Sequence, residues 1–312
     1  MLYLGDCLDI LPTISQKIDL VLVDLPYGQT ANKWDVCIDL NKMWIELKKI
    51  CKKSCTYIFF STVRFGHQLI NSNPLWFRYD LIWEKSNVAG YLSAKRAPLR
   101  THEMIYIFST DESTYITDHD TREYFRKIRA YINKPAKDIR ELFKQKANNH
   151  CWYYDSTQFT ILPELNYNQL ISEYKINDMD GFIEYKDIKK QKDIIKKIYN
   201  PQMTAGKPYK NKAGALNKNY NSIRTETKNN TGERYPKSIL KFNSECHTIH
   251  STQKPVLLLE YLIKTYSNEK DIVLDFTMGS GSTGVACRST KRQFIGIEMD
   301  KDIYYSAVNR LW

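Results

Sequence analysis

Long apolar runs and paired cysteine motifs are both missing from this 312-residue sequence. No apolar stretch approaches the ~18 residues that a membrane-spanning helix needs, so the sequence predicts no membrane segment. Seven cysteines occur without a CxxC pair, and Cys51 and Cys55 have no histidine nearby. This usage predicts reduced thiols and no zinc or other metal site. The first residues lack a charged leader and a small-residue cleavage site, so we expect no signal peptide and a cytoplasmic protein.

Acidic residues are scarce in one segment, and that segment holds the whole net charge of +11. Residues 186–241 contain 15 Lys and Arg against 4 Asp and Glu, so the rest of the chain is neutral. A basic arm on a neutral body is typical of proteins that bind a polyanion, because Lys and Arg neutralise phosphates. A solvated lysine-rich surface would give the same count. The charge alone leaves both interpretations open.

Strand-like and helix-like runs alternate over residues 1–110 and again from His250 onward, but not over residues 115–245. Such alternation predicts an α/β fold with a parallel-type sheet covered on both faces. The charged middle stretch is then an insertion between two halves of one sheet. The expected strands are Leu20–Val23, Thr56–Phe60, Leu81–Trp83, Met104–Phe108, Ile272–Asp275 and Gln293–Ile297, and the expected helices are Leu40–Lys52, Val256–Ser267, a segment after Gly281, and Lys301–Arg310.

The stretch IVLDFTMGSGSTGVACRS combines a strand, a glycine-rich turn and the start of a helix. Gly279, Gly281 and Gly284 satisfy GxGxxG, a spacing that lets the backbone approach a ligand at a helix amino terminus. Glu298 ends the next strand and could hold both hydroxyls of a ribose, which indicates an adenosine-containing ligand. A dinucleotide-binding dehydrogenase carries such a loop too, but only 28 residues follow Gly284. The remaining strands must therefore come from the amino-terminal third.

Four short blocks stand in a fixed order along the chain: Asp24–Tyr27 (DLPY), His250–Pro255 (HSTQKP), Asp275–Gly281 (DFTMGSG) and Gly296–Asp300 (GIEMD). Together they resemble the motifs of the β-group DNA amino-methyltransferases, in which the catalytic motif precedes the cofactor motif. The resemblance implies a Rossmann-like class I methyltransferase fold that is circularly permuted, with a mostly parallel sheet of roughly seven strands. Weaker matches are Leu81–Asn87 (LIWEKSN) and Arg96–Ser109 (RAPLRTHEMIYIFS).

The resemblance assigns the catalytic site to the tetrapeptide Asp24-Leu25-Pro26-Tyr27. Adenine N6 is a poor nucleophile because its lone pair is delocalised into the ring. The Asp24 carboxylate and the Leu25 carbonyl would hold the two amino hydrogens and draw N6 toward a tetrahedral geometry. Pro26 stiffens the bend, and Tyr27 offers a ring on which a flipped-out base stacks. A turn carboxylate and a packed core ring are the structural alternatives for Asp24 and Tyr27.

The resemblance also implies S-adenosylmethionine as the cofactor. Asp275 and the loop after it would hold the methionine amino end, Lys254 would face the methionine carboxylate, and Glu298 would hold the ribose. Asp6 would lie near the adenine amino group, although a turn-forming Asp after Gly5 fits the sequence equally well. The expected cofactor-binding residues are Asp6, Cys7, Thr252, Gln253, Lys254, Asp275, Phe276, Thr277, Gly279, Ser280, Gly281 and Glu298.

The middle of the chain is predicted to recognise the target. Residues 122–176 carry several short helical patterns that resemble a helix-turn-helix unit, with a recognition stretch around Asn148–Gln158. A helical dimerisation or packing insert is the alternative. The basic arm of residues 186–241 is predicted to form a loop and ribbon that contact phosphates and bases. The resulting division is 1–115 for the catalytic half, 116–245 for the target-recognition insertion and 246–312 for the cofactor-binding half.

The function predicted from these motifs is site-specific methylation of adenine N6 in double-stranded DNA, without a metal. Cytosine-N4 methylation is the alternative, although enzymes of that type usually carry Ser at the position of Asp24. Cytosine-C5 methylation is disfavoured because none of the ten prolines precedes a cysteine. A non-catalytic DNA-binding protein on the same fold is the rival from another class. The resemblance further suggests a homodimer and a cognate restriction endonuclease as partners, and leaves both open.

Overall fold

The computed structural model describes residues 1–28, 35–109, 118–143, 150–154, 159–188, 198–211, 216–217, 222–223, 228–245 and 253–312. The chain divides into two compact units. The first unit joins Met1–Ser109 to Ile198–Trp312, and the second consists of Thr110–Lys197. The two ends of the chain therefore fold together, as the alternation of strands and helices predicts.

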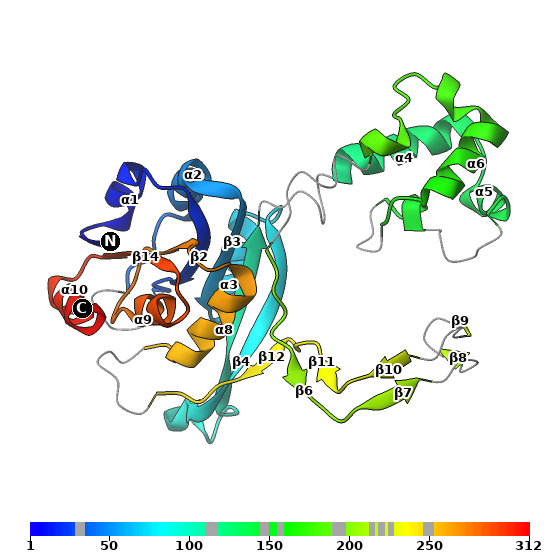
Figure 1. Ribbon diagram of the computed structural model, residues 1–312. Coiled ribbons are helices and arrows are strands. Elements are labelled where there is room, and N and C mark those ends of the chain that lie inside the picture. Colours follow the sequence, from blue (N-terminus) through cyan, green and yellow to red (C-terminus); the bar gives the residue numbers. More distant parts are fainter. Residues whose placement is uncertain are drawn as a thin grey trace. The chain divides into compact units, whose positions relative to one another are not determined.

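An eight-stranded sheet forms the centre of the first unit (Figure 1). Five neighbouring pairs of its strands are parallel, and two are antiparallel because β5 runs against both β3 and β4. The predicted mostly parallel sheet is confirmed, with eight strands where roughly seven are expected. In order across the sheet, the strands are β1 (Leu2–Leu4), β14 (Gln293–Glu298), β13 (Ile272–Asp275), β2 (Ile18–Asp24), β3 (Cys51–Ser61), β5 (Arg100–Ser109), β4 (Phe77–Ala89) and β12 (Ile239–Lys241).

Side chains of the central strands alternate between two apolar cores, one on each face of the sheet. Along β2, Val21 and Val23 belong to one core, and Leu20 and Leu22 belong to the other. All four are buried because helices cover both faces. The helices α1 (Cys7–Ile10), α2 (Leu40–Ile50) and α3 (Val63–Ser72) pack on the first face, α8 (Val256–Tyr266) and α9 (Ser282–Ser289) pack on the second, and α10 (Lys301–Leu311) contacts β1, β14 and α9.

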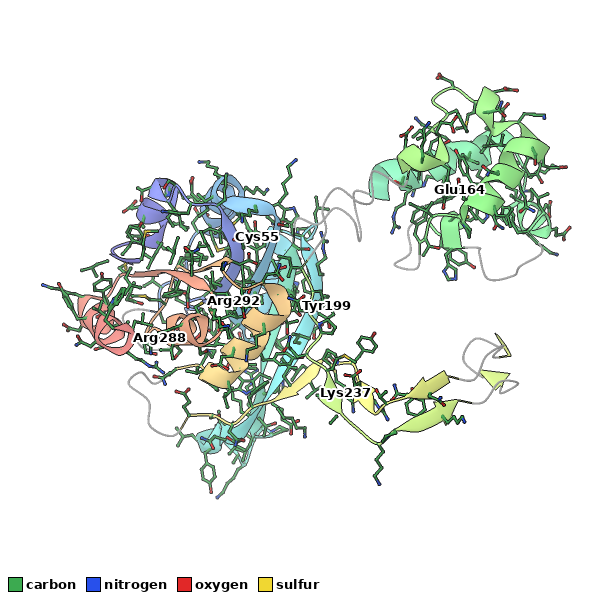
Figure 2. The ribbon with its side chains drawn as sticks, viewed as in Figure 1. Cys55, Glu164, Tyr199, Lys237, Arg288 and Arg292 are labelled. Carbon is green, nitrogen blue, oxygen red and sulfur yellow. The ribbon has the colours of Figure 1, made fainter. Side chains whose placement is uncertain are left out.

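The second unit is helical and has its own apolar core. Phe125, Trp152, Phe159 and Tyr167 are among its buried side chains. Its elements are α4 (Asp118–Ile132), α5 (Ala136–Glu141), the 3₁₀ turns η3 (His150–Trp152) and η4 (Ile176–Asp178), and α6 (Glu164–Tyr174), whose first residue is labelled in Figure 2.

The predicted recognition stretch, residues 148–158, is described only at 150–154. There the chain forms the three-residue turn η3 instead of an α-helix. Cys151 and Trp152 of this turn are buried in the core of the unit, so they are not available for base contacts. A helix that could enter a major groove is therefore not found in the described part of this stretch.

The basic arm forms an antiparallel ribbon in part, as predicted. Three nested strand pairs follow one another along one hairpin (Figure 1). The pairs are β6 (Thr204–Ala205) with β11 (Glu233–Arg234), β7 (Tyr209–Asn211) with β10 (Lys228–Asn230), and β8 (Leu216–Asn217) with β9 (Ser222–Ile223).

Both ends of this ribbon are joined to the sheet unit. On one side, the Tyr199 ring, labelled in Figure 2, lies 5.9 Å from the Tyr266 ring, and the Asn200 amide donates to the Thr265 carbonyl at 2.7 Å. On the other side, β12 pairs in parallel with β4. Because of these contacts, residues 198–245 group with the sheet, whereas the sequence suggests one insertion over 116–245.

Candidate active site

Four neighbouring parallel strands end at the same edge of the sheet, and each delivers a carboxylate there. Asp24 ends β2, Asp275 ends β13 and Glu298 ends β14, while Asp6 follows β1 by two residues. All four line one cavity of about 410 Å³. The Thr277 hydroxyl donates to the Asp24 carbonyl at 2.9 Å and joins the two halves directly. The catalytic and cofactor motifs predicted from opposite ends of the chain therefore meet.

The glycine loop turns the chain from β13 into α9 at the floor of this cavity. Gly281 has φ of 75°, a conformation that side chains other than glycine rarely adopt. At Gly284 an added Cβ would lie 2.8 Å from the Phe294 ring, so this glycine allows the helix to pack closely on β14. The amide of Gly279 donates to the Glu298 carboxylate at 2.9 Å and fixes its direction. The loop thus shapes the cavity through its backbone.

The wall of the cavity is rich in acceptors. The Asp275 carboxylate is buried and accepts from the Thr283 hydroxyl at 2.6 Å and the Thr277 amide at 3.2 Å. Burial raises its pKa to about 7, although these two hydrogen bonds oppose the shift. Asp6 caps α1 by accepting from the Leu8 amide at 2.8 Å, which matches the turn role weighed for it, and it also lines the cavity. Burial raises the pKa of the neighbouring Cys7 to about 12, so this side chain stays a thiol.

This set of acceptors fits S-adenosylmethionine, whose ammonium, ribose hydroxyls and adenine amino group are all donors. Carboxylates spread along one cavity are the complementary acceptors. Of the predicted cofactor-binding residues, Gly281 is not among those that line the cavity, and Thr252 lies outside the described residues. The predicted residues that do line it are Asp6, Cys7, Asp24, Leu25, Pro26, Tyr27, Gln253, Lys254, Asp275, Phe276, Thr277, Gly279, Ser280 and Glu298.

Asp24 is held by hydrogen bonds on both carboxylate oxygens. The Tyr27 hydroxyl donates to Oδ1 at 2.5 Å, and the Lys254 ammonium donates to Oδ2. Asp35 fixes the turn from below by accepting from the backbone amide of Tyr27 at 2.6 Å. The Tyr27 ring packs against the Phe65 ring, with centroids 5.3 Å apart. The tetrapeptide is therefore a turn held by hydrogen bonds at several points. The Tyr27 ring is half-buried against Phe65, so it is packed in part, and stacking of a base on it stays a prediction.

Lys254 lies between two carboxylates. Besides Asp24, its ammonium contacts Glu103 at 3.1 Å, and Lys85 reaches the same Glu103 at 2.6 Å. The ammonium also lies 5.1 Å from the Phe60 ring centroid. The side chains of Lys254 and Glu103 are 10% and 12% exposed, so the pair is screened weakly by water. Two cations and two carboxylates therefore form one nearly buried network at the end of β2.

Burial and charge act against each other in this network. Burial raises the pKa of Asp24, which Lys254 opposes and Glu103 reinforces. Burial would also raise the pKa of Glu103, but Lys254 and Lys85 hold it below its usual value. Burial would lower the pKa of Lys254, but Asp24 and Glu103 raise it above its usual value. Lys254 and Glu103 are therefore both ionised at neutral pH.

The predicted contact of Lys254 with the methionine carboxylate stays a prediction, and the structure shows two other partners for this side chain. The structure directs its ammonium at Asp24 and Glu103. The adjacent Gln253 donates to Glu245. The segment that leads into α8 therefore crosses the end of β2, and it holds the Asp24 carboxylate as well as lining the cavity.

A second cavity of about 370 Å³ adjoins the first. Asp24, Tyr27 and Lys254 line both, so these residues form the boundary between them. The other walls come mainly from the antiparallel strands β4 and β5 and include Lys85 and Glu103. The site thus consists of two adjoining chambers, with Asp24 on the boundary between them.

Sequence reasoning missed three residues of this site: Asp35, Lys85 and Glu103. A signal existed for two of them, because Lys85 lies in LIWEKSN and Glu103 in RAPLRTHEMIYIFS, the two weaker matching blocks. Asp35 carries no such signal, since its role follows from a hydrogen bond that it accepts from the Tyr27 amide, eight residues away.

Three further features of the described residues concern metal sites, cysteines and membrane-spanning helices. Among them no group of three or more His, Cys, Asp or Glu side chains is arranged to hold a metal ion. The six cysteines within the described ranges are free thiols. No helix in the part of the chain that the structure describes is long and apolar enough to cross a membrane.

The chain is similar in sequence to known DNA methylases. A family model described as DNA methylase, covering N6 and N4 enzymes, matches residues 18–309. The type II methyltransferase M.HindIII of Haemophilus influenzae is 35% identical over 130 residues, which are 38% of this chain and 41% of that protein. The type II methyltransferase M1.MboII of Moraxella bovis is 25% identical over 308 residues, covering 95% of this chain and 90% of the relative.

The fold is also shared with a solved structure. The PvuII DNA methyltransferase (cytosine-N4-specific) aligns with a TM-score of 0.51 and 12% identity, covering 100% of this chain and 86% of that one. This likeness confirms the predicted Rossmann-like class I methyltransferase fold. S-adenosylmethionine is the cofactor, as predicted. From the match over nearly its whole length, the chain belongs to the N6/N4 DNA methylase family.

Proposed function

We propose that this chain transfers a methyl group from S-adenosylmethionine to N6 of an adenine flipped out of double-stranded DNA. The observation that carries the proposal is the position of Asp24 at the boundary of two adjoining cavities. With the cofactor in the first cavity and the base in the second, the amino nitrogen and the methyl group would meet beside this carboxylate. The order of the motifs supports assignment to the permuted β-group.

The chain would activate the amino group by orienting it. S-adenosylmethionine would supply an electrophilic methyl group to N6; the carbon–sulfur bond would break with its electron pair left on sulfur, and N6 would release one proton to water. The Asp24 carboxylate and the Leu25 carbonyl would each accept one amino hydrogen, which localises the lone pair on N6. Burial raises the pKa of Asp24, and a more basic carboxylate is a stronger acceptor. Lys254 opposes this rise in pKa.

The cofactor roles follow the acceptors of the first cavity. Asp275 would accept from the methionine ammonium, Glu298 from the ribose hydroxyls and Asp6 from the adenine amino group. The amides of Gly279 and Asp300 hold the Glu298 carboxylate, each at 2.9 Å, so it would meet the ribose already oriented. Phe276, Thr277 and Ser280 would close the wall around the amino-acid end.

Cytosine-N4 methylation is the second candidate, because the solved structure with the shared fold is titled cytosine-N4-specific. Asp24 favours adenine, since the N4 enzymes of this family usually carry Ser there. Mass spectrometry of nucleosides from DNA treated with protein and S-adenosylmethionine distinguishes the two. N6-methyladenine is expected; N4-methylcytosine alone would overturn the choice of base. A protein that binds the cofactor but yields neither would instead be a non-catalytic DNA-binding protein.

We propose double-stranded DNA as the partner of the basic ribbon. Its charge matches a phosphate backbone, and its base is stiffened by Arg234, which lies 4.7 Å from the Tyr209 ring centroid and donates to Asn230. The helical unit of residues 110–197 would serve target recognition or dimerisation. A bacterial or phage-infected cytoplasm, a homodimer and a cognate restriction endonuclease are consistent with a modification enzyme and belong to the same proposal.

A further inference from the structure

The hairpin that joins β4 to β5 ends in two apolar side chains that nothing covers among the described residues. Tyr91 is 79% exposed and Leu92 is fully exposed, at 104%. Val88, just before them, is 50% exposed. Neighbouring apolar side chains held in water are unfavourable unless a partner buries them, so such a tip indicates an interaction site.

The tip is a defined turn. Gly90 takes a left-handed conformation with φ of 88°, and the turn η2 (Tyr91–Ser93) follows. The Ser93 amide donates to the Gly90 carbonyl at 2.9 Å, and the Ala94 amide donates to the Tyr91 carbonyl at 3.1 Å. Two further backbone bonds, from the amides of residues 96 and 97, end on the Ser93 carbonyl. This hydrogen bonding presents Tyr91 and Leu92 in one orientation, so little conformational entropy would be lost on binding.

The base of the same hairpin forms a wall of the second cavity. Asn87 on β4 and Arg100 on β5 both line it, together with Asp24 and Tyr27. Tyr91 follows Asn87 by four residues, a reach of roughly 13 Å in extended chain. The apolar tip therefore extends from the chamber that we assign to the target base.

The charged residues around the tip indicate what kind of partner it would bind. Residues 85–102 include Lys85, Lys95, Arg96 and Arg100 and contain no Asp or Glu. Lys95, Arg96 and Arg100 are exposed. An apolar tip between cations complements a DNA duplex, in which stacked bases lie between two rows of phosphates.

We propose that Leu92 and Tyr91 insert into the duplex beside the target and occupy the space that the flipped base leaves, while Lys95 and Arg96 contact the flanking phosphates. Apolar wedges of this kind unstack base steps in other DNA-binding proteins. The inference rests on the proposed function, because it requires a base that leaves the duplex.

Methylation of matched and mismatched duplexes tests the wedge. The recognition sequence is first read from DNA methylated by the wild-type protein; failure at this step contradicts the proposed function rather than the wedge. The variant Tyr91→Ala/Leu92→Ala is then compared with Leu75→Ala, which removes another exposed leucine (58%) at the opposite end of β4. In one duplex the target base is paired, and in the other it faces an abasic site and needs little energy to flip.

The double variant is expected to methylate the paired target about tenfold or more slowly than wild type and the unpaired target at the wild-type rate. When 2-aminopurine replaces the target base, its fluorescence should rise as the wild-type protein flips it. In the double variant this rise should be lost with the paired duplex and kept with the unpaired one. Leu75→Ala should match wild type throughout. Equal loss on both duplexes would overturn the proposal, because the tip would then serve binding. Wild-type rates on both would overturn it as well, as would a dimer that dissociates in the double variant, because the tip would then join two copies.

Discussion

The two cavities that meet at Asp24 are built differently. The first is lined by the ends of four parallel strands and by a glycine loop, and its charged groups are carboxylates except for Lys254. The second is lined mainly by long antiparallel strands, and its three cations (Lys85, Arg100 and Lys254) are matched by three carboxylates (Asp24, Glu103 and Glu245). An acceptor-rich chamber suits a ligand with many donors, whereas a chamber of balanced charge shows no such preference. The proposed assignment of the donor-rich cofactor to the first chamber rests on this difference.

If both chambers serve one reaction, substitution of Asp24 between them should reduce the rate of methylation more than any other change. Asp24→Ala removes the acceptor for the amino hydrogen, so kcat should fall about 10³-fold while cofactor affinity changes little. Single-turnover methylation and a cofactor titration measure the two quantities. Asp302→Ala, an exposed carboxylate in the first turn of α10, is the control and should leave both unchanged. Turnover close to wild type in Asp24→Ala would remove Asp24 from the site.

A substitution confined to the first chamber should affect the cofactor alone. Glu298→Gln weakens the acceptor for the ribose hydroxyls, so the KM for S-adenosylmethionine should rise about tenfold with kcat retained. Steady-state kinetics at saturating DNA provide the measurement. Glu269→Gln is the matched control, because that carboxylate is exposed and forms a 3.5 Å pair with Lys291. A fall in kcat without a change in KM would contradict the assignment of this chamber.

The charge network between the chambers should control the pH dependence. Glu103 raises the pKa of Asp24 and Lys254 lowers it. With ionised Asp24 as the active form, Glu103→Gln should move the acid limb of the kcat profile to lower pH, and Lys254→Met should move it to higher pH. At neutral pH the rate of Lys254→Met should fall several-fold, whereas that of Glu103→Gln should not fall. Shifts in the same direction, or none, would show that this network does not set the ionisation of Asp24.

Asp275 should show opposite effects on stability and on cofactor binding. Its folded pKa is raised to about 7 by burial, whereas an unfolded Asp titrates near its usual value of 3.8, so the folded state loses stability as pH rises from about 4 through 7. Asp275→Asn should therefore have a Tm a few degrees above that of wild type at pH 8, with a smaller difference at pH 5. Thermal unfolding at both pH values measures this.

The same variant should bind the cofactor more weakly, because the neutral amide is a poorer partner for an ammonium group. Cofactor affinity of the wild type should also decline below about pH 7, where Asp275 becomes protonated, and this decline should be absent in Asp275→Asn. A variant that is no more stable at pH 8, or whose binding keeps the wild-type pH dependence, would show that Asp275 is not the buried partner of the ammonium.

The first chamber could be predicted from the sequence because its geometry is local. Asp275, the glycines and Glu298 belong to strand–turn–helix segments, and the carboxyl ends of parallel strands meet at one edge. Asp275, Gly279 and Glu298 all line the cavity, whereas Gly281 shapes the turn without lining it. The contact between Lys254 and Asp24 could not be predicted, because it depends on how the chain enters α8 across β2, 230 residues from Asp24.

The second chamber was much less predictable. Glu103 and Lys85 meet because β4 and β5 pair in a register that places Trp83 opposite Glu103. A shift of one residue would reverse the faces of all these side chains, and strand propensity does not specify it. Within the predicted recognition stretch, the described residues 150–154 contain the 3₁₀ turn η3, and Cys151 and Trp152 belong to a tertiary core that the local sequence pattern does not specify.

The most direct measurement is a crystal structure of the protein with S-adenosylhomocysteine, the product left after methyl transfer. We expect its ribose hydroxyls at Glu298, its ammonium at Asp275 and its sulfur directed toward Asp24, with the second cavity left for the base. A product bound in the chamber between β4 and β5, or at any place from which the sulfur cannot approach Asp24, would contradict the shared site.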